Sequence, residues 1–600
     1  MANDQVVVGD IPAQRHGFQP RPAVLRQLGQ TGQGPPVVVL TGTWGVGKTQ
    51  LAATYARARL AGGWRLIAWV NARDSQSLLA GLAAAAEATG LSDGDSRPDT
   101  ADAGQALRHW LEADGSRCLL VFDDAGDLDL LRPFVPAVGA ARVLITGARE
   151  PTTALGARVP VDVFTTEEAL ALLDGRTGLA DEGGASAVAA ELGHLPLALD
   201  QAAAVIAGQH LGYAAYLAKL RALLAEDHPV RKEDGDEQPY PPGVAEAVLL
   251  SLEAAGDADP LGVCTGVMEV MAVLSPTAVR CDLLRAAGQA GTLLGGGRRV
   301  AASLVDQALK RLTERSLLGF SLDGQAVSVH GLVARVVRGG LARQGRLATA
   351  CRAAASALEM SAGAPAKPWN HATVGELLGQ VTTLLDNAGM RAGDADEKLA
   401  RMLARLQFVA LCHLIELGGS MPHAIAIGEP LIVDLERLLG PDHPDTLNAR
   451  NSLAAAYQAE GRTAEAIPLV EQTLAGRERL LGLDHPDTLS TRNTLAIAYH
   501  AAGRTAEAIP LVEQILAARE RLLGPDHLST LAARNNLASA YRATGRPAEA
   551  IPLFEMNVAA CERLLGADHP RTVASRHHLD LARQESARAG NAGRGPQERD

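Results

Sequence analysis

The stretch Gly42-Thr43-Trp44-Gly45-Val46-Gly47-Lys48-Thr49 decides how the first part of this 600-residue chain folds. The apolar run 36–40 precedes it, and the helix-forming residues 50–56 follow it. A G-x-x-x-x-G-K-[ST] loop between a strand and a helix directs backbone N–H groups and the positive helix end at a polyphosphate. A glycine-rich turn arising by chance is the alternative, which these flanks disfavour. The sequence therefore predicts a nucleotide-binding α/β domain.

Individual roles follow from the chemistry of the loop. Lys48 is expected to reach the β and γ phosphate oxygens, and Thr49 to offer its hydroxyl to Mg²⁺. Only six lysines occur in a chain whose cations are otherwise arginines, so a compact ammonium stands where a planar guanidinium would not fit. The residues of this stretch expected to contact the nucleotide are Gly42, Thr43, Gly45, Val46, Gly47, Lys48, Thr49 and Gln50.

Composition limits the class of protein. The chain is too long for one core, and its 47% hydrophobic and 21% charged residues are typical of globular domains. A net charge of −12 argues against a general affinity for nucleic acid. No long uncharged apolar run and no secretory leader are recognisable, which predicts a cytoplasmic protein without membrane spans. The six scattered cysteines are expected to be buried thiols.

A second acidic element is predicted at the end of a buried strand, residues 117–124. Asp123 is expected to hold Mg²⁺, and Asp124 to orient or deprotonate the attacking water. An exposed strand terminus would also end in acids, although the upstream phosphate loop favours the functional interpretation. A further strand over 141–146 leads to Arg149, which either senses the γ-phosphate or is a solvated surface arginine.

An internal repeat occupies the C-terminal third. Asp442-His443-Pro444 recurs as Asp484-His485-Pro486, Asp526-His527 and Asp568-His569-Pro570, a spacing of 42 residues. Each unit has helical apolar periodicity on both sides of a glycine, Gly461 in the first, and so predicts a helical hairpin. Hairpins of this kind share a core by stacking into a superhelix. Pro468, Pro510 and Pro552 should kink the second helix slightly.

The repeat pattern Leu-Ala-x-x-Tyr-x-x-x-Gly-x-x-x-x-Ala resembles tetratricopeptide repeats of the kinesin-light-chain type. The N-terminal part resembles the signal-transducing ATPases with numerous domains (STAND), in their NB-ARC branch. That likeness is carried by three segments outside the ATP-binding core. They are the lead-in Gly17-Phe18-Gln19-Pro20-Arg21, the motif Gly193-His194-Leu195-Pro196-Leu197, and a hairpin with an Asp323-Gly324 turn that leads to Val329-His330-Gly331.

The STAND resemblance implies further site residues. Arg21 and Pro196 would lie against the adenine, and His330 would contact the β-phosphate of ADP. His330 could instead cap a helix or pack in the core. Gly331 replaces the aspartate of the family motif, which implies weaker retention of ADP. ATP, ADP and Mg²⁺ are the implied cofactors, with slow ATP hydrolysis as the implied activity.

The fold class predicted is multidomain: an α/β P-loop NTPase core, a small helical domain, a winged helix and an all-α tetratricopeptide superhelix. The predicted boundaries are a lead-in contacting the nucleotide (1–35), the NTPase domain (36–165), the helical domain (166–226), a linker (227–242), the winged helix (243–345), a helical connector (346–400), the repeats (401–585) and a disordered tail (586–600).

These features predict a switch that is closed with ADP and opens or oligomerises with ATP, with the repeats binding a protein or peptide. Asn451, Asn493 and Asn535 stand at one helical position and could hold a peptide backbone, with the preceding arginines holding acidic groups. Alternatively these asparagines bridge neighbouring repeats. Two rival functions are a winged-helix transcription regulator that binds DNA and a non-hydrolysing scaffold with a structural nucleotide.

Overall fold

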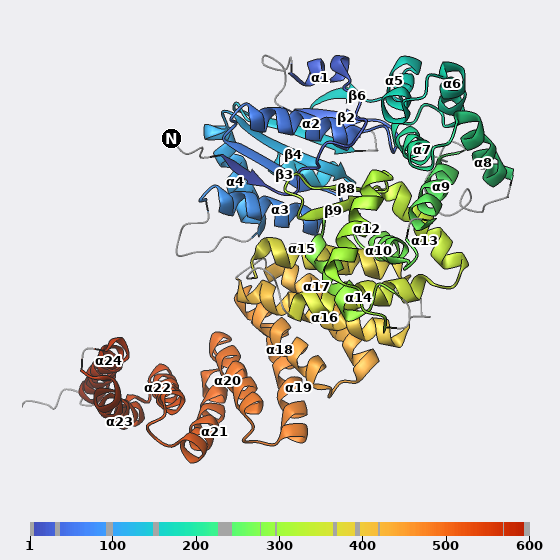
Figure 1. The fold of residues 1–600 in the computed structure, drawn as a ribbon. Helices are drawn as coiled ribbons and strands as arrows, with labels where there is room; N and C mark the ends of the chain where they lie inside the picture. The colour runs from blue at the N-terminus through green and yellow to red at the C-terminus, as the bar shows by residue number, and fades with distance from the viewer. Residues whose placement is uncertain are drawn as a thin grey trace, which may run out of the picture. The chain divides into compact units, whose positions relative to one another are not determined.

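A computed structural model describes the chain in two compact units, residues 1–420 and 421–600. The described residues are 5–29, 37–91, 100–147, 155–225, 243–257, 259–276, 278–294, 297–363, 369–389, 396–417, 421–567 and 569–592. The predicted linker 227–242 and Arg149 lie outside these ranges. Figure 1 shows the order of the elements along the chain.

The first unit begins with a six-stranded parallel sheet in the order β1-β3-β4-β5-β2-β6. The strands are β1 (Val6–Val8), β2 (Val37–Thr41), β3 (Leu66–Asn71), β4 (Cys118–Ala125), β5 (Arg142–Gly147) and β6 (Ala157–Pro160). Continuous apolar runs such as Val37–Thr41 suit strands with both faces covered. Helix α2 (Lys48–Ala61) lies on one side of the sheet, and α3 (Ser75–Ala88) and α4 (Thr100–Asp114) lie on the other (Figure 1).

Strand β1 corrects one boundary. The sequence analysis separates residues 1–35 from the NTPase domain, whereas Val6–Val8 pairs with β3 and forms the edge of its sheet. Three valines are too short a run to predict a strand by periodicity alone, and only the neighbouring β3 gives them partners. The rest of the lead-in carries helix α1 (Pro22–Gly29).

Two helical groups follow the sheet. The first consists of α5 (Thr166–Thr177), α6 (Glu182–Glu191), α7 (Pro196–Gln209) and α8 (Tyr213–Ala225). The second has the make-up of a winged helix, with α9 (Val244–Asp257), α10 (Val263–Val273), α11 (Cys281–Ala290), α12 (Ala302–Glu314) and α13 (Gly331–Arg343), and a sheet of β7 (Val279–Arg280), β9 (Ala326–Val329) and β8 (Leu318–Phe320). The β8–β9 hairpin turns at the predicted Asp323-Gly324, where Gly324 has φ 70°.

Three helices complete the first unit: α14 (Leu347–Gly363), α15 (His371–Asn387) and α16 (Glu397–Glu416). Helix α15 packs against α3 of the α/β domain. The approach is close, since a Cβ on Gly375 would lie 2.2 Å from that of Ala80. The same helix reaches the winged helix, because the Asn387 amide donates to the carbonyl of Val273 at 2.8 Å. Helix α15, within the segment 346–400 predicted only as a connector, therefore contacts two domains.

The second unit is a stack of helical hairpins. Its helices are α17 (Met421–Leu439), α18 (Pro444–Ala459), α19 (Thr463–Leu481), α20 (Pro486–Ala501), α21 (Thr505–Leu523), α22 (Leu528–Ala543), α23 (Pro547–Leu565) and α24 (Pro570–Ala592). Helix α16, which contains the predicted start of the repeats at 401, belongs to the first unit. Helix α24 also corrects the predicted tail from 586, because it continues to Ala592.

The recurring histidines and arginines have structural roles in the repeats. The Nδ1 atoms of His443, His485, His527 and His569 each accept the backbone N–H two residues later and so cap a helix. Arg450, Arg492 and Arg534 are buried and pair with Glu436, Glu478 and Glu520 of the preceding helix. The idea that these arginines hold acidic groups of a peptide is therefore wrong, because their guanidinium groups are already paired within the stack.

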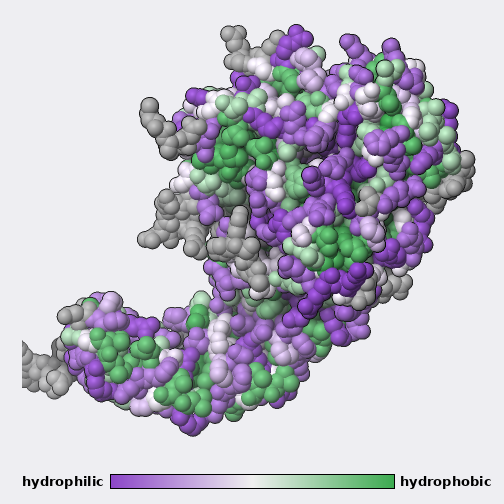
Figure 2. Space-filling model, viewed as in Figure 1, coloured by the Kyte–Doolittle hydropathy of each residue, from purple (hydrophilic) through white to green (hydrophobic). Residues whose placement is uncertain are grey.

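The surface of the repeat unit alternates between hydrophilic areas and hydrophobic patches (Figure 2). Among its exposed apolar side chains are Leu480, Leu522 and Leu564, which occupy the same position in successive units. Among the described helices, none combines the length and the apolar character that crossing a membrane requires.

Candidate nucleotide site

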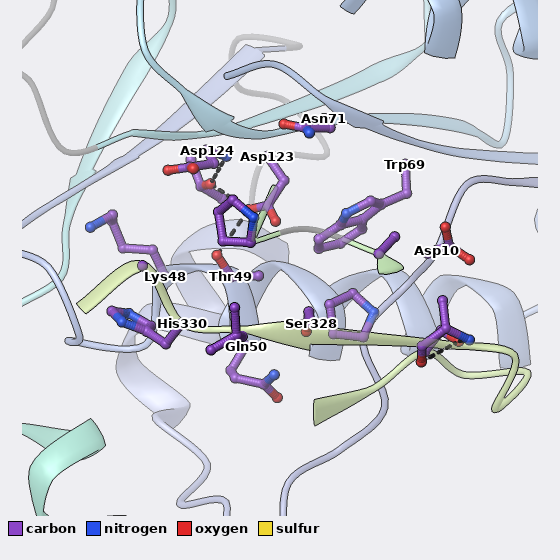
Figure 3. A pocket seen from close by; sticks show the side chains of 18 of the residues that line it. Asp10, Lys48, Thr49, Gln50, Trp69, Asn71, Asp123, Asp124, Ser328 and His330 are labelled. Atoms are coloured by element: carbon purple, nitrogen blue, oxygen red, sulfur yellow. Dashed lines mark hydrogen bonds between the residues drawn. The ribbon is translucent and has the colours of Figure 1, made fainter. Parts of the chain in front are cut away.

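A cavity of about 630 Å³ lies in the first unit where four parts of the chain meet. The lead-in, the phosphate loop with the ends of β3 and β4, the start of α7 and the winged-helix hairpin all line it. Figure 3 shows Lys48, Thr49, Asp123, Asp124 and His330 grouped together, with Trp69 and Asp10 further along the same cavity. Carboxyl ends of parallel strands are where ligands bind in sheets of this type.

The phosphate loop has the backbone that its glycines predict. Gly45 and Gly47 have φ values of 81° and 96°, in the left-handed region that side chains disfavour. Lys48 is the first residue of α2, and its Nζ donates to the carbonyls of Gly42 at 2.8 Å and Thr43 at 2.9 Å. Burial lowers the pKa of Lys48 to about 8, partly offset by Asp124 and Asp123. This partly dehydrated ammonium therefore gains from meeting an anion.

Asp123 lies beside Thr49, the other residue predicted to hold Mg²⁺. Its Oδ1 accepts hydrogen bonds from the hydroxyls of Thr49 at 2.9 Å and Thr146 at 2.6 Å. Burial raises the pKa of Asp123 to about 6, an effect that these two hydrogen bonds oppose. Thr49 and Asp123 thus offer two adjacent oxygen atoms, and Mg²⁺ commonly takes one or two protein oxygens together with phosphate oxygens and water. The residues present fit such an ion.

Asp124 is held in an unusual backbone conformation. Its φ is 57°, its backbone N–H donates to the Thr146 hydroxyl at 3.0 Å, and the β4–β5 register shifts beside it. A non-glycine residue in this region is uncommon and is found often at functional sites. Burial raises the pKa of Asp124, while Arg73, whose Nη1 lies 3.8 Å from its carboxylate, and Lys48 oppose that shift. The carboxylate lines the cavity, as its predicted role requires.

Arg21 lines the cavity but already has partners. Its guanidinium donates to the carbonyls of Asp162 at 2.8 Å and Val163 at 3.2 Å, and its Nε lies 3.6 Å from Glu168. These contacts attach the lead-in to the segment between β6 and α5. Arg21 thereby shapes the pocket wall, and its predicted contact with adenine stays a prediction.

His330 caps a helix, as one of the two alternatives predicts, while its contact with a phosphate stays a prediction. It is the N-cap of α13, where its Nδ1 accepts the N–H of Leu332 at 3.2 Å, and it also lines the cavity. Burial and the positive charges of Arg15 and Lys48 lower its pKa to about 3. A neutral imidazole therefore faces the phosphate loop from the winged helix.

The remaining predicted contacts divide into two groups. Gly45, Val46, Gly47, Thr49, Gln50 and Pro196 line the cavity. Gly42 and Thr43 are not among its described lining residues and instead supply the carbonyls that hold Lys48. The sequence analysis missed Arg15, Trp69 and Asp10, which belong to no recognisable motif and reach the cavity only through the fold.

The three predicted peptide-binding asparagines lie in the repeat unit and are half-buried. Asn451 has a buried Oδ1 without a hydrogen-bond partner, while the Oδ1 of Asn535 lies 3.4 Å from Nδ1 of His578 in α24. The contact of Asn535 agrees with the bridging alternative in the last unit.

Comparisons with known proteins give a family match for the repeats and similarities to two solved structures. Residues 424–479, 449–521, 487–556 and 529–588 match the tetratricopeptide repeat family. A kinesin light chain repeat structure from Podosopora anserina is 34% identical over 32% of this chain and 90% of its own, with a TM-score of 0.29. A STAND protein with a tetratricopeptide repeat sensor from Pyrococcus horikoshii aligns over 97% of this chain and 96% of its own, at 13% identity and a TM-score of 0.36.

Curated relatives match a smaller share. The regulatory protein AfsR of Streptomyces griseus is 32% identical over 216 residues, which is 33% of this chain and 22% of that protein. AfsR of Streptomyces coelicolor matches similarly, at 32% identity over 221 residues. The chain thus spans about a fifth of the length of these relatives.

Fold and site together define the class: this is a P-loop protein with a parallel α/β domain and C-terminal helical repeats. Residues 424–588 are tetratricopeptide repeats.

Proposed function

We propose that this protein is a signalling switch controlled by ATP and ADP, whose tetratricopeptide repeats bind a protein or peptide. The observation that carries the proposal is the shared cavity, in which Lys48 of the phosphate loop and His330 of the winged helix face the same space. A nucleotide there would contact two domains at once. It can shift their arrangement because its contacts differ between the closed and open states.

Helix α15 provides a route from this cavity toward the repeats. It packs on α3, whose residues line the cavity, and Ser275 of the winged-helix region donates its N–H to Gln380 of α15 at 2.8 Å. Helix α16 follows α15 in the chain and precedes the repeats. A change in the nucleotide-binding domain therefore acts directly on the helices that lead to the repeat unit.

The rival DNA-binding function has less support. Two arginines of the winged helix are paired with acids: Arg280 with Asp282 at 3.4 Å, and Arg285 with Asp282 at 2.7 Å and Asp306 at 2.8 Å. Phosphate contacts would have to break these pairs before any counterion release could favour binding. Exposed leucines at repeating positions in the second unit favour a protein partner instead.

The decisive experiment measures nucleotide affinity and the molar mass of the nucleotide-free protein with ADP·Mg²⁺ and with ATP·Mg²⁺ by light scattering. We expect ATP to increase the mass or the hydrodynamic radius relative to ADP, and Lys48→Ala to abolish this difference. Tight nucleotide binding with identical mass and radius in both states would favour the scaffold with a structural nucleotide. Absence of nucleotide binding would contradict the proposal as a whole.

The partner half of the proposal has its own test in the triple variant Asn451→Ala, Asn493→Ala, Asn535→Ala. If these side chains bind a peptide, the variant should bind ATP normally, melt within about 2 °C of the parent, and lose a partner that the parent captures. If they bridge repeats, the loss of buried hydrogen bonds should cost about 1–3 kcal/mol each and melt the second unit. Circular dichroism of the full chain separates the two outcomes.

A further inference from the structure

Arg15 is a cation inside the cavity for which the described contacts supply no close anion. It lies in the lead-in between β1 and α1, and its side chain is 21% exposed. Its nearest acidic partner is Asp200 of α7, at 4.0 Å from Nη1. That distance is the outer limit of an ion pair and too long for a hydrogen bond.

Asp200 does not depend on Arg15 for neutralisation. Arg176 of α5 forms a short charged hydrogen bond with the Asp200 carboxylate and also donates to its carbonyl at 2.9 Å. The same guanidinium donates to the Ser316 hydroxyl at 2.7 Å and to the carbonyl of Glu314 at 3.0 Å. Asp200 and Arg176 thus form a complete pair that joins the helical domain to the winged helix. Arg15 lies beside this pair as an additional charge.

The Arg15 guanidinium has donors to spare. Its Nε is buried and lacks a hydrogen-bond partner. The winged-helix hairpin leaves room for the group, since a Cβ on Gly319 would lie only 3.8 Å from Nη2 and 3.9 Å from Nε of Arg15. A guanidinium has five N–H donors and no means of becoming neutral. Leaving a buried donor unpaired is costly, so this site favours an incoming anion.

The position of Arg15 indicates which anion that is. Arg15, Lys48 and His330 all line the cavity, and the positive charges of Arg15 and Lys48 both act on His330. His330 is therefore within electrostatic range of a cation from the lead-in and of one from the phosphate loop. An anion that neutralised both would occupy the space in front of the imidazole.

We propose that Arg15 is a phosphate-binding residue, which together with the ammonium of Lys48 and the imidazole of His330 encloses the di- or triphosphate of the nucleotide. The proposal rests on the nucleotide site and adds a residue to it. Arginine suits this task because its planar fork can donate two parallel hydrogen bonds to a phosphate. The lead-in already pairs with the winged-helix hairpin through Ala13 N–H to the Phe320 carbonyl at 2.9 Å, and phosphate binding by Arg15 would reinforce that contact.

Competition with a fluorescent ADP derivative tests this assignment in the full-length protein, using ADP and adenosine as the competing ligands. We expect Arg15→Gln to weaken ADP about tenfold to a hundredfold, the range of charged hydrogen bonds, and to change adenosine binding less than about twofold. Arg15→Lys should recover part of the loss because it retains the charge. The matched control is Arg26→Gln in α1, since Arg26 is exposed and donates only to the carbonyl of Pro22 among the described contacts.

The melting temperature of the ligand-free variants separates binding from folding. Arg15→Gln should melt within about 2 °C of the parent because Asp200 keeps Arg176, whereas Arg176→Gln should melt lower. Equal losses for adenosine and ADP, or unchanged ADP affinity in Arg15→Gln, would overturn the assignment while leaving the nucleotide site intact. Failure of the parent to bind ADP would instead overturn the site and Arg15's role together.

Discussion

Buried cationic side chains have different partners in the two units of this protein. In the repeats, Arg450, Arg492 and Arg534 each pair with a glutamate and each donate to a backbone carbonyl, in one arrangement repeated unit by unit. Around the cavity, Lys48 donates to two loop carbonyls, and Arg15 lies 4.0 Å from Asp200, a carboxylate that Arg176 already holds.

This difference distinguishes side chains that stabilise the fold from side chains that can bind a ligand. A paired buried arginine stabilises the stack and has little capacity left for a ligand. An unpaired buried arginine lowers the free energy of unfolding, and an anionic ligand that pairs with it offsets this loss. Buried charged groups of this kind cluster at functional sites. Four predictions, ordered from the largest effect to the smallest, test whether charged groups of the first unit serve ligand binding and those of the second unit serve stability.

Removing the ammonium of the phosphate loop should give the largest effect. Lys48→Ala deletes charged hydrogen bonds to at least two phosphates, so we expect ATP·Mg²⁺ affinity to fall by a factor of roughly 10² to 10⁴. The fold should persist because Lys48 contacts loop carbonyls rather than the core. Calorimetry measures the affinity, with the exposed Lys219→Ala as control. Equal affinity of variant and parent would contradict the assignment of the loop.

In the repeats, removing a buried cation should lower stability rather than nucleotide affinity. Arg534 has a side chain 2% exposed and donates to Glu520 at 2.6 Å, so Arg534→Ala leaves a cavity and an unpaired glutamate. We expect a loss of about 2–3 kcal/mol in stability of the second unit, with unchanged nucleotide affinity. Denaturant unfolding, monitored by circular dichroism, measures this loss of stability.

Arg576 provides a matched control for this prediction. It makes the same kind of contact with Glu562, at 2.9 Å from Nε, but its side chain is 44% exposed. Arg576→Ala should therefore cost less than about 1 kcal/mol. Equal effects at the two positions would show that burial does not set the strength of this repeated pair.

Gly331 tests how firmly the winged helix holds ADP. A Cβ there would lie 3.6 Å from the Trp44 ring, an ordinary contact, so aspartate can be accommodated. At the first turn of α13, the new carboxylate would interact favourably with the helix dipole and order the segment that carries His330. Gly331→Asp should slow ADP release about twofold to fivefold in stopped-flow displacement. Gly339→Asp on the same helix is the control, and a faster release in Gly331→Asp would contradict the prediction.

His330 should give the smallest signal, a proton taken up when ADP binds. Its pKa is about 3, because of burial and the charges of Arg15 and Lys48. Phosphates offset those charges and raise that pKa, so binding takes up protons and ADP affinity should rise as the pH falls toward 6. Calorimetry without Mg²⁺ at pH 6, in buffers of different ionisation enthalpy, measures the uptake.

His330→Asn isolates this contribution, because asparagine retains the helix cap. Lys48, with a pKa near 8, stays protonated at pH 6 in both proteins, and Asp123 contributes equally to both. Equal proton uptake by variant and parent would show that the imidazole does not sense the phosphates.

The structural elements that the sequence predicts correctly are those marked by repetition or by motif spacing. The phosphate loop, the acidic end of β4, the Asp323-Gly324 hairpin and the hairpin repeats all rest on local patterns, in which each residue acts on neighbours a few positions away. The structure places each of these elements where its pattern predicts, with the phosphate loop between β2 and α2.

The predictions from the sequence were wrong where interacting residues lie far apart in the chain. Strand β1 exists because β3 pairs with it across about sixty residues, and the repeat arginines are occupied by glutamates of the preceding helix. Position in a repeat shows that a residue recurs. It does not show whether that residue faces the core, a neighbouring unit or solvent.

The sequence by itself determined the phosphate loop between a strand and a helix, the Asp323-Gly324 hairpin and the tetratricopeptide stack, because short-range geometry fixes glycine loops, turns and helical periodicity. Only the tertiary structure decided that Arg15 lies in the cavity with Lys48 and His330, and that α15 contacts both α3 and the winged-helix region. Electrostatic and packing interactions depend on distance in space, and residues 15, 48 and 330 become neighbours only after the domains have folded together.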